Sequence, residues 1–310
     1  MKLFYPFFIL STILIFSGCI NDDISECPVE EEDNFILKFR YQSNDPNELF
    51  IEKIQQVNVF IFTQEGKFVT SLSADLEALT TFAGVTMDLD PGSYYVICWG
   101  NISAKTFISP LNVTSNIADA FLSNIATRNN TTATDGDKLY YASDNIVLSS
   151  NLKATTTNII ERILNFKNAY IKVQVYIKGF VDKNLQGQSL PPIVEMASVP
   201  GGYNFSMQTS GNDVRYLNTT SFQNISGEEI SAVTFYTPRF TNNNAINVLI
   251  KKTSDGSTVN SINLKDFMKE NNISIEGIED AVVPMLIEYK QASVEIGIPE
   301  WEQNPVDPEL

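Results

Sequence analysis

The chain has 310 residues, a formal net charge of −16 and no histidine. This acidity disfavours nucleic acids and anionic lipids as partners, because both are polyanions. The lack of histidine removes the commonest general base and metal ligand, so enzymatic functions are disfavoured as well. Apart from Cys19, only Cys27 and Cys98 remain, which is too few cysteines for a zinc site. We therefore expect no catalytic residues, no metal and no cofactor.

The first residues have the pattern of a lipoprotein signal peptide. Lys2 supplies a positive charge, residues 3–16 are mostly apolar, and Ser17 and Gly18 are the small residues that a signal peptidase requires. The apolar run is shorter than the roughly 20 residues that cross a bilayer core. We therefore expect cleavage between Gly18 and Cys19, followed by lipidation of Cys19.

Lipidation of Cys19 would hold the protein on a membrane. Two or three acyl chains, at ~0.8 kcal/mol per buried CH₂, meet the requirement of two signals for stable anchoring. The acidic residues Asp22, Asp23 and Glu26 follow closely. Such a patch is similar to the export signal of surface lipoproteins, so we expect a lipid-anchored protein that is exposed on the outer membrane.

Cys27 and Cys98 are the right number of cysteines for one bridge. An exported protein reaches an oxidising compartment, where disulfides form and persist. We therefore predict a disulfide between Cys27 and Cys98.

Short strands separated by turns dominate the remaining pattern. Residues 56–62 are apolar on both faces, which predicts a strand covered on both sides. Residues 171–178 instead alternate between apolar and polar, which predicts a strand with one wet face that opens a second domain. Helices are expected at Asp75–Leu79 and Leu264–Glu270. Strands are expected at Phe35–Tyr41, Gln56–Phe62, Val85–Leu89, Tyr94–Trp99, Lys138–Ala142, Ile171–Lys178, Ala232–Tyr236, Ile246–Lys251, Val259–Leu264, Val282–Tyr289 and Val294–Ile298.

This pattern is typical of a mostly β chain built from sandwiches. Roughly 290 residues after the signal indicate two domains. Residues 103–134 are interpreted as a long connection with a helical turn near 118–125, and residues 155–168 as the bridge between the domains. The expected divisions are a signal peptide (1–18), a lipidated linker (19–33), an N-terminal sandwich (34–160) and a C-terminal sandwich (161–310).

Several motifs have a chemical and a structural interpretation. Asp135-Gly136-Asp137 and Asp255-Gly256 are similar to fragments of calcium loops, but both lack the remaining oxygen ligands at the required spacing. Aromatic residues could stack on sugar rings, but strand alternation favours core positions for them. These aromatic residues are Trp99, Trp301, Tyr94, Tyr95, Tyr140 and Tyr141.

Strings of residues along the chain resemble the fimbrillin-associated anchor lipoproteins, a family of anchor subunits of type V pili. The strings are residues 22–28 after Cys19, residues 57–62 with Gly66, residues 89–95 leading into 98–101, residues 262–267, and residues 294–298 with Trp301. The resemblance implies two transthyretin-like β-sandwich domains in tandem. It further implies a structural role at the base of a fimbria, with fimbrial stalk subunits as partners and the outer membrane as the site of the lipid anchor.

Two other functional classes stay open. A surface lipoprotein that binds glycans would also be β-rich, acidic and lipidated, and a hydrolase would need a mechanism that uses carboxylates alone. Genomic neighbours distinguish the fimbrial anchor from the glycan-binding protein. Fimbrillin-like genes favour the anchor, whereas porin and glycosidase genes favour the glycan-binding protein.

The resemblance also raises the question of which end of the chain joins the fibre. In that family, stalk subunits lose an N-terminal strand after cleavage at an arginine, and a partner's strand fills the groove. Here no arginine or lysine lies between Cys19 and Lys38, and Lys38 and Arg40 lie inside the expected strand Phe35–Tyr41. We therefore expect this strand to stay in its own sheet and Val294–Ile298 to be the donor segment, although the prolines that follow it lack ladder N–H groups.

Overall fold

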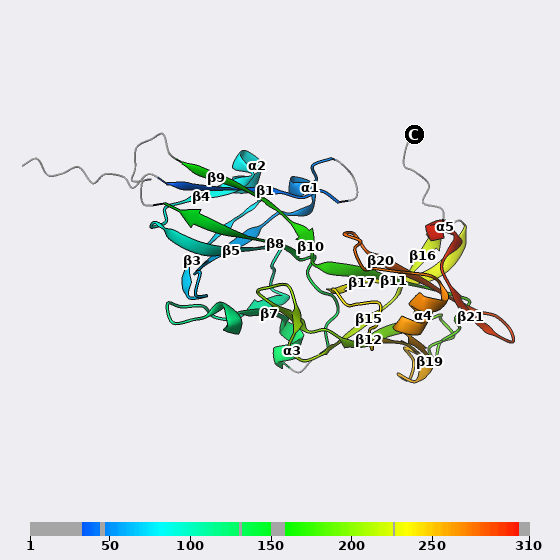
Figure 1. Ribbon diagram of the computed structural model, residues 1–310. Helices are drawn as coiled ribbons and strands as arrows, with labels where there is room; N and C mark the ends of the chain where they lie inside the picture. The colour runs from blue at the N-terminus through cyan, green and yellow to red at the C-terminus, as the bar shows by residue number, and fades with distance from the viewer. Residues whose placement is uncertain (1–32, 44–46, 130–131, 150–158, 226, 304–310) are drawn as a thin grey trace, which may run out of the picture. The chain divides into compact units, whose positions relative to one another are not determined.

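The computed structural model describes residues 33–43, 47–129, 132–149, 159–225 and 227–303. Contacts within the chain separate residues 1–32 from the unit 33–310, which contains every described residue. Strands arranged in several sheets dominate this unit, with only short helices (Figure 1). The mostly β fold class, with sandwich layers in tandem, is confirmed.

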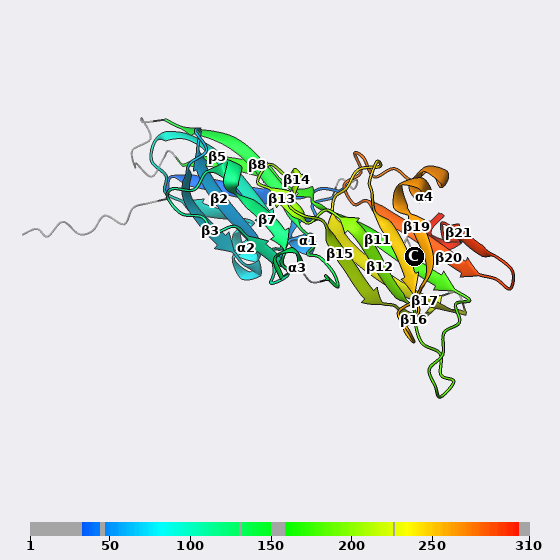
Figure 2. The same cartoon turned by 90° about the horizontal axis from the view of Figure 1, so that it is seen from below.

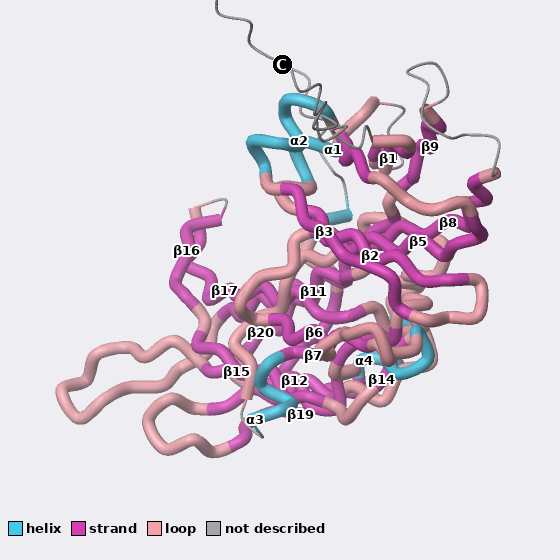
Figure 3. Tube along the Cα trace, turned by 90° about the vertical axis from the view of Figure 1, so that its left-hand side faces the viewer, coloured by secondary structure: helices cyan, strands magenta, loops and turns pink. Residues whose placement is uncertain are grey.

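Three sheets make up the layers near the N-terminal part of the unit. Their strand orders are β4-β1-β9, β10-β8-β5-β2-β3 and β14-β13-β7-β6. The sheet that contains β5 and β8 lies between β1 on one side and β7 on the other (Figures 1 and 3). The strands are β1 (Phe35–Arg40), β2 (Val57–Thr63), β3 (Phe68–Ala74), β4 (Gly84–Met87), β5 (Gly92–Gly100), β6 (Thr106–Ile108), β7 (Phe121–Asn124), β8 (Tyr140–Leu148), β9 (Ile160–Asn165), β10 (Lys167–Asn168), β13 (Gly202–Asn204) and β14 (Thr209–Ser210).

Strand β2 shows why the middle sheet needs two neighbours. Val57, Val59 and Ile61 point into the core shared with β1, whereas Phe60 and Phe62 point into the opposite core. A strand that is apolar on both faces can bury both only between two layers. The prediction of a strand covered on both sides is confirmed.

Two sheets, of order β16-β17-β11-β20-β21 and β15-β12-β18-β19, form the second sandwich. Figure 2 shows β12, β15 and β19 over β11, β17 and β20. Ile171, Val173, Val175 and Ile177 of β11 all lie in the core between them, as their alternation predicted. The strands are β11 (Tyr170–Lys178), β12 (Ile193–Val199), β15 (Val214–Thr219), β16 (Ser221–Ile225), β17 (Glu228–Pro238), β18 (Asn247–Lys251), β19 (Thr258–Asn263), β20 (Val282–Tyr289) and β21 (Val294–Gly297).

The helices are short and begin at side-chain caps where the sequence supplies them. Asp75 accepts a hydrogen bond from Ala78 N at the start of α2, and Asn263 accepts one from Asp266 N at the start of α4. Both predicted helices are confirmed. None of the described helices is long and apolar enough to cross a membrane. The helices are α1 (Phe50–Lys53), α2 (Leu76–Phe82), the 3₁₀ helix η1 (Ile117–Asp119), α3 (Ile125–Asn129), α4 (Leu264–Glu270) and α5 (Glu300–Gln303).

Two segments differ from their predicted form. The expected connection 103–134 contains β6, η1, β7 and α3, and the expected bridge 155–168 contains β9 and β10. Strand β9 pairs in parallel with β1, and β7 pairs with β13, a strand from much later in the chain. These short, partly polar strands depend on distant partners, so local sequence patterns do not reveal them. The domain boundary between residues 160 and 161 stays a prediction.

Candidate functional site

Strand β1 is the centre of its sheet. It pairs antiparallel with β4 and in parallel with β9, so both of its edges are occupied. Phe35, Leu37 and Phe39 are buried in the core. The Lys38 ammonium lies 3.4 Å from the centroid of the Phe82 ring and donates a hydrogen bond to Phe82 O. The N-terminal strand therefore fills its own place in the fold.

Strand β21, the expected donor segment, is an edge strand. It pairs antiparallel with β20 and ends the strand order of its sheet. Val294 and Ile296 are 43% and 39% exposed. A donor role would require β21 to leave this ladder, whereas its outer edge can add a strand without rearrangement.

The short helix α5 covers the outer face of the same sheet. The Trp301 ring stands edge-on to Tyr176, with 5.5 Å between centroids, and the Tyr176 hydroxyl donates to Glu302 Oε1 at 3.2 Å. Burial, together with the charge of Glu302, raises the pKa of Tyr176 to about 12. The contact fixes the last described residues against the second sandwich.

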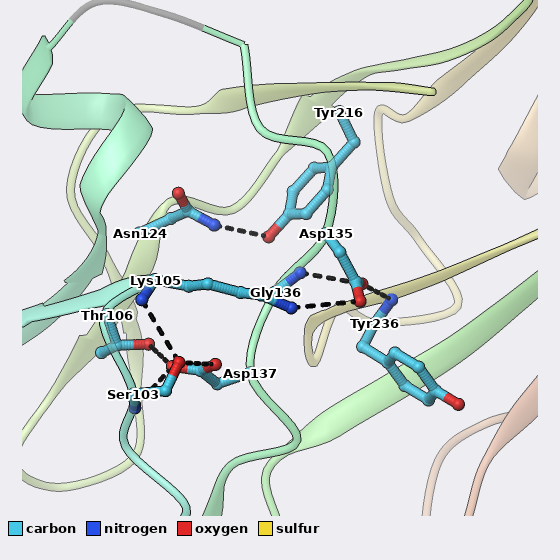
Figure 4. A network of polar contacts seen from close by, with 9 residues as sticks. All are labelled: Ser103, Lys105, Thr106, Asn124, Asp135, Gly136, Asp137, Tyr216 and Tyr236. Carbon is cyan, nitrogen blue, oxygen red and sulfur yellow. Dashed lines mark hydrogen bonds and ion pairs between the residues drawn. The ribbon is translucent and has the colours of Figure 1, made fainter. Parts of the chain in front are cut away.

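Asp135, Gly136 and Asp137 form a clasp between the early and late parts of the unit (Figure 4). Asp135 Oδ1 accepts hydrogen bonds from Gly136 N at 2.9 Å and from Tyr236 N, on β17, at 2.8 Å. Asp137 accepts both the amide N–H and the hydroxyl of Ser103, at 2.9 and 2.6 Å. These carboxylates therefore serve as acceptors for neighbouring segments.

Glycine is required at position 136 because the backbone there lies very close to that of Tyr236 on β17. A Cβ at this position would lie 2.4 Å from Tyr236 O, well inside van der Waals contact. The motif that was similar to a calcium loop is thus a close crossing of two chain segments. Asp255-Gly256, the other fragment, forms a turn in which Asp255 Oδ1 accepts from Ser257 N at 2.8 Å and Gly256 has a φ of 72°.

Arg239 makes a second set of contacts between the early and late parts of the unit, which together with the Asp135-Gly136-Asp137 clasp we call the joint. Its guanidinium donates to the carbonyl oxygens of Ile275, Ile278 and Glu279 at 3.0, 2.7 and 2.9 Å. Three backbone acceptors around one rigid cation fix the loop that precedes β20. The backbone N–H of Arg239 donates to the hydroxyl of Tyr203 on β13.

Asp280 collects hydrogen bonds from segments that precede the second sandwich. The Tyr41 hydroxyl and the Asn168 amide both donate to Asp280 Oδ1 at 2.8 Å. Burial alone would raise the pKa of Asp280, but the hydrogen bonds from Ser43, Asn168 and Tyr41 hold it below its usual range. The end of β1 is therefore tied to the start of β20 through an ionised carboxylate.

The predicted site residues lie mostly outside the described part. Gly18, Cys19 and Cys27 fall within residues 1–32, so cleavage, lipidation and the disulfide stay predictions. Cys98 lies on β5, is fully buried and forms no disulfide with another described residue. Within the described ranges, no three His, Cys, Asp or Glu side chains are grouped at metal-binding spacing.

The aromatic residues considered for sugar stacking are structural. Trp99, Tyr94 and Tyr140 are buried, and Trp301 packs on Tyr176. Tyr95 and Tyr141 pack against the core between the middle sheet and β7. The joint residues were missed, although the Asp135-Gly136-Asp137 string gave a signal that its carboxylates had a local role.

Comparison with known proteins places the chain in one family. The family model of fimbrillin-A associated anchor proteins Mfa1 and Mfa2 matches residues 24–304. No curated protein sequence matches the chain.

Several solved structures share this fold. The fimbrial anchor protein Mfa2 from Porphyromonas gingivalis matches with a TM-score of 0.63 and 15% identity, over 84% of this chain and 96% of that one. A proposed adhesin from Bacteroides ovatus matches with a TM-score of 0.65 and 15% identity, over 86% and 94%. A proposed polysaccharide-binding protein from Bacteroides thetaiotaomicron matches with a TM-score of 0.65 and 15% identity, over 83% and 91%. At these identities the matches show the fold.

Proposed function

The chain belongs to the family of fimbrillin-A associated anchor proteins, and from this we propose that it anchors a fimbria to the outer membrane and ends fibre growth. A fimbrial role follows from the family itself. Membrane anchoring and termination are the parts proposed here, and each has its own support.

The filled position of β1 supports termination, and it is the observation on which the proposal depends most. Strand exchange, in which a partner's strand takes the place of one of the subunit's own, requires a vacant place within the sandwich. Strand β1 is paired on both edges, and Phe35, Leu37 and Phe39 occupy the core beneath it. A fibre that reaches this subunit therefore meets a sandwich that has no vacant place at β1.

The sequence of residues 1–32 supports membrane anchoring. The signal pattern ends at Gly18, and Cys19 is placed to receive the lipid. The described unit begins at Asp33, so a lipidated linker of this length would connect the membrane to β1. Fimbrial stalk subunits are the expected partners of the folded unit.

A structural, non-enzymatic role agrees with the chemistry of three half-buried carboxylates. The carboxylates of Asp135, Asp137 and Asp280 accept hydrogen bonds from neighbouring backbone and side-chain groups. Groups that are saturated in this way hold segments together, which is what a protein under tension requires.

Deletion of the gene tests both parts of the proposal. We expect fimbriae to appear in the medium, because the tether is lost, and to be longer than normal, because growth is no longer ended. Electron microscopy of the cells and of the medium measures both properties. Fibres of unchanged length that stay attached to the deletion strain would refute the anchor function.

A further inference from the structure

We propose that the outer face of the sheet β14-β13-β7-β6 binds a neutral glycan, a function that goes beyond anchoring and stands independently of it. A cleft of about 420 Å³ lies on this face, within the size range of small-molecule sites. Residues from η1, β7, α3 and the β13–β14 hairpin line it, including Asp119, Phe121, Ser123, Arg128, Asn204 and Asn212.

The alternation of β7 decides which side chains face the cleft. Leu122 lies in the core, so Phe121 and Ser123 point to the opposite face. Ser123 is paired with Phe107 on β6 and with Gly202 on β13, which places these three residues side by side on one surface. Gly202 is required by the close approach of β7, because a Cβ there would lie 1.9 Å from Leu122 O.

An aromatic platform stands at one side of the cleft. Phe121 is 39% exposed, and its ring centroid lies 6.0 Å from that of Phe107. The Arg128 guanidinium lies 3.6 Å from the centroid of the Phe107 ring, and this contact helps to hold the ring in place. The electron-rich face of an aromatic ring attracts partly positive edges. The C–H groups on one face of a sugar ring have that character.

Polar groups that can hold sugar hydroxyls line the rest of the cleft. Asp119 can accept hydrogen bonds and Arg128 can donate several. The Ser123 hydroxyl is buried and has no hydrogen-bond partner among the described residues. An unpartnered buried hydroxyl costs free energy, and a ligand hydroxyl that reached the floor of the cleft would give it a partner. The Asn204 amide is already used within its own turn, so it shapes the wall.

The charge balance favours an uncharged ligand. Asp119 and Arg128 offset each other in the cleft, whereas the whole chain carries a formal charge of −16. An acidic peptide or a sialylated glycan would be repelled by the field of the protein. A neutral oligosaccharide, with apolar ring faces and hydroxyl edges, fits both the platform and the polar wall.

Saturation-transfer NMR and titration calorimetry on the mature, detergent-solubilised protein test the proposal. The neutral probes are maltotriose, cellotriose and triacetylchitotriose, and sialyllactose and an acidic peptide are the anionic ones. We expect at least one neutral probe to bind and to receive saturation at its ring C–H protons. Binding of none of the neutral probes at millimolar concentration, or stronger binding of an anionic probe, would overturn the proposal.

Phe121→Ala locates the site. We expect this change to weaken binding roughly tenfold, since burial of a phenylalanine ring contributes free energy of that order. Phe222→Ala is the matched control, because Phe222 is 44% exposed on β16, outside the cleft. Equal loss in both variants, or none in Phe121→Ala, would contradict the assignment.

Ser123→Ala separates ligand binding from folding. Removal of a buried hydroxyl without a partner should leave the thermal unfolding midpoint unchanged or raise it. The same change should weaken binding severalfold, because the ligand loses its contact at the floor. Unchanged affinity would show that the ligand does not reach Ser123 and would remove the floor from the proposed site.

Discussion

At the scale of single residues, the joint between the early and late parts of the unit depends on a position that has no space for a larger side chain. Gly136 lies where Tyr236 O would be 2.4 Å from an added Cβ, and Asp135 bonds the Tyr236 N–H. The lack of a side chain at Gly136 allows the close approach to Tyr236, and the Asp135 carboxylate stabilises it through a hydrogen bond. A small change at Gly136 would separate the two segments and break the hydrogen bond as well.

Gly136→Ala should lower the free energy of unfolding by about 1–3 kcal/mol, because the added methyl group overpacks a backbone crossing. Gly297→Ala is the control, since no heavy atom lies within 4 Å of a Cβ at that position. It should change stability by less than about 0.5 kcal/mol. Urea unfolding measures both, and a Gly136→Ala protein as stable as the control would show that the crossing can relax freely.

Glu195 illustrates how a buried charge makes stability depend on pH. It lies on β12, and its carboxylate oxygens lie 2.6 Å from Arg215 Nη2 and 2.5 Å from Lys251 Nζ. Burial raises the pKa of Glu195, but the hydrogen bonds and charges of Lys251 and Arg215 outweigh burial, so the pKa is lower than usual. A lowered folded-state pKa stabilises the protein above the unfolded value and loses this effect as pH falls through the folded value.

Glu195→Gln should therefore cost roughly 1–3 kcal/mol at neutral pH, because the two cations lose their partner. The difference from wild type should shrink as pH falls below 4.5, the ordinary pKa of the side chain. Glu229→Gln, at an exposed position on β17, controls for the loss of one negative charge. A difference that stays constant from neutral to acidic pH would contradict the assigned ion pairs.

At the scale of elements, β1 should resist proteolysis although it contains two basic residues. Trypsin needs an unpaired, extended backbone, whereas Lys38 is paired with both β4 and β9 and Arg40 is paired with β9. Lys183 instead lies exposed in the connection between β11 and β12, where a single isolated bridge to Ser189 is its only strand pairing among the described residues. We expect native cleavage after Lys183 well before cleavage after Arg40, as mass spectrometry of the fragments would show. In urea both sites should be cut, and early native cleavage after Arg40 would mean that β1 opens readily.

Elements with strong local patterns could be predicted from the sequence, and those that depend on remote partners could not. The alternation in β11 and the two apolar faces of β2 identified both strands, and the helix Leu264–Glu270 was predicted with its observed bounds. Strands β7 and β13 are short and gain their hydrogen bonds from each other across the sequence. The cleft on the outer face of their sheet was hidden for the same reason, since Phe121 lay in a segment interpreted as a connection.

At the scale of the whole molecule, the proposed tethering and the proposed termination depend on different parts of the chain. The expected lipid site Cys19 lies in residues 1–32, whereas the filled position of β1 belongs to the unit 33–310. A change at Cys19 should leave the sheets intact, because no described strand includes that region. The two functions can therefore be separated by mutation.

Fimbria length and attachment in three strains test the central claim most directly: wild type, gene deletion and Cys19→Ala, with export of the variant checked by immunoblotting. We predict that both mutants release fimbriae into the medium. The deletion strain should make longer fibres, whereas the Cys19→Ala strain should make fibres of wild-type length, because the folded unit with its filled sheet still ends growth. Released fibres that are equally long in both mutants, or fibres that stay attached in the Cys19→Ala strain, would contradict the account.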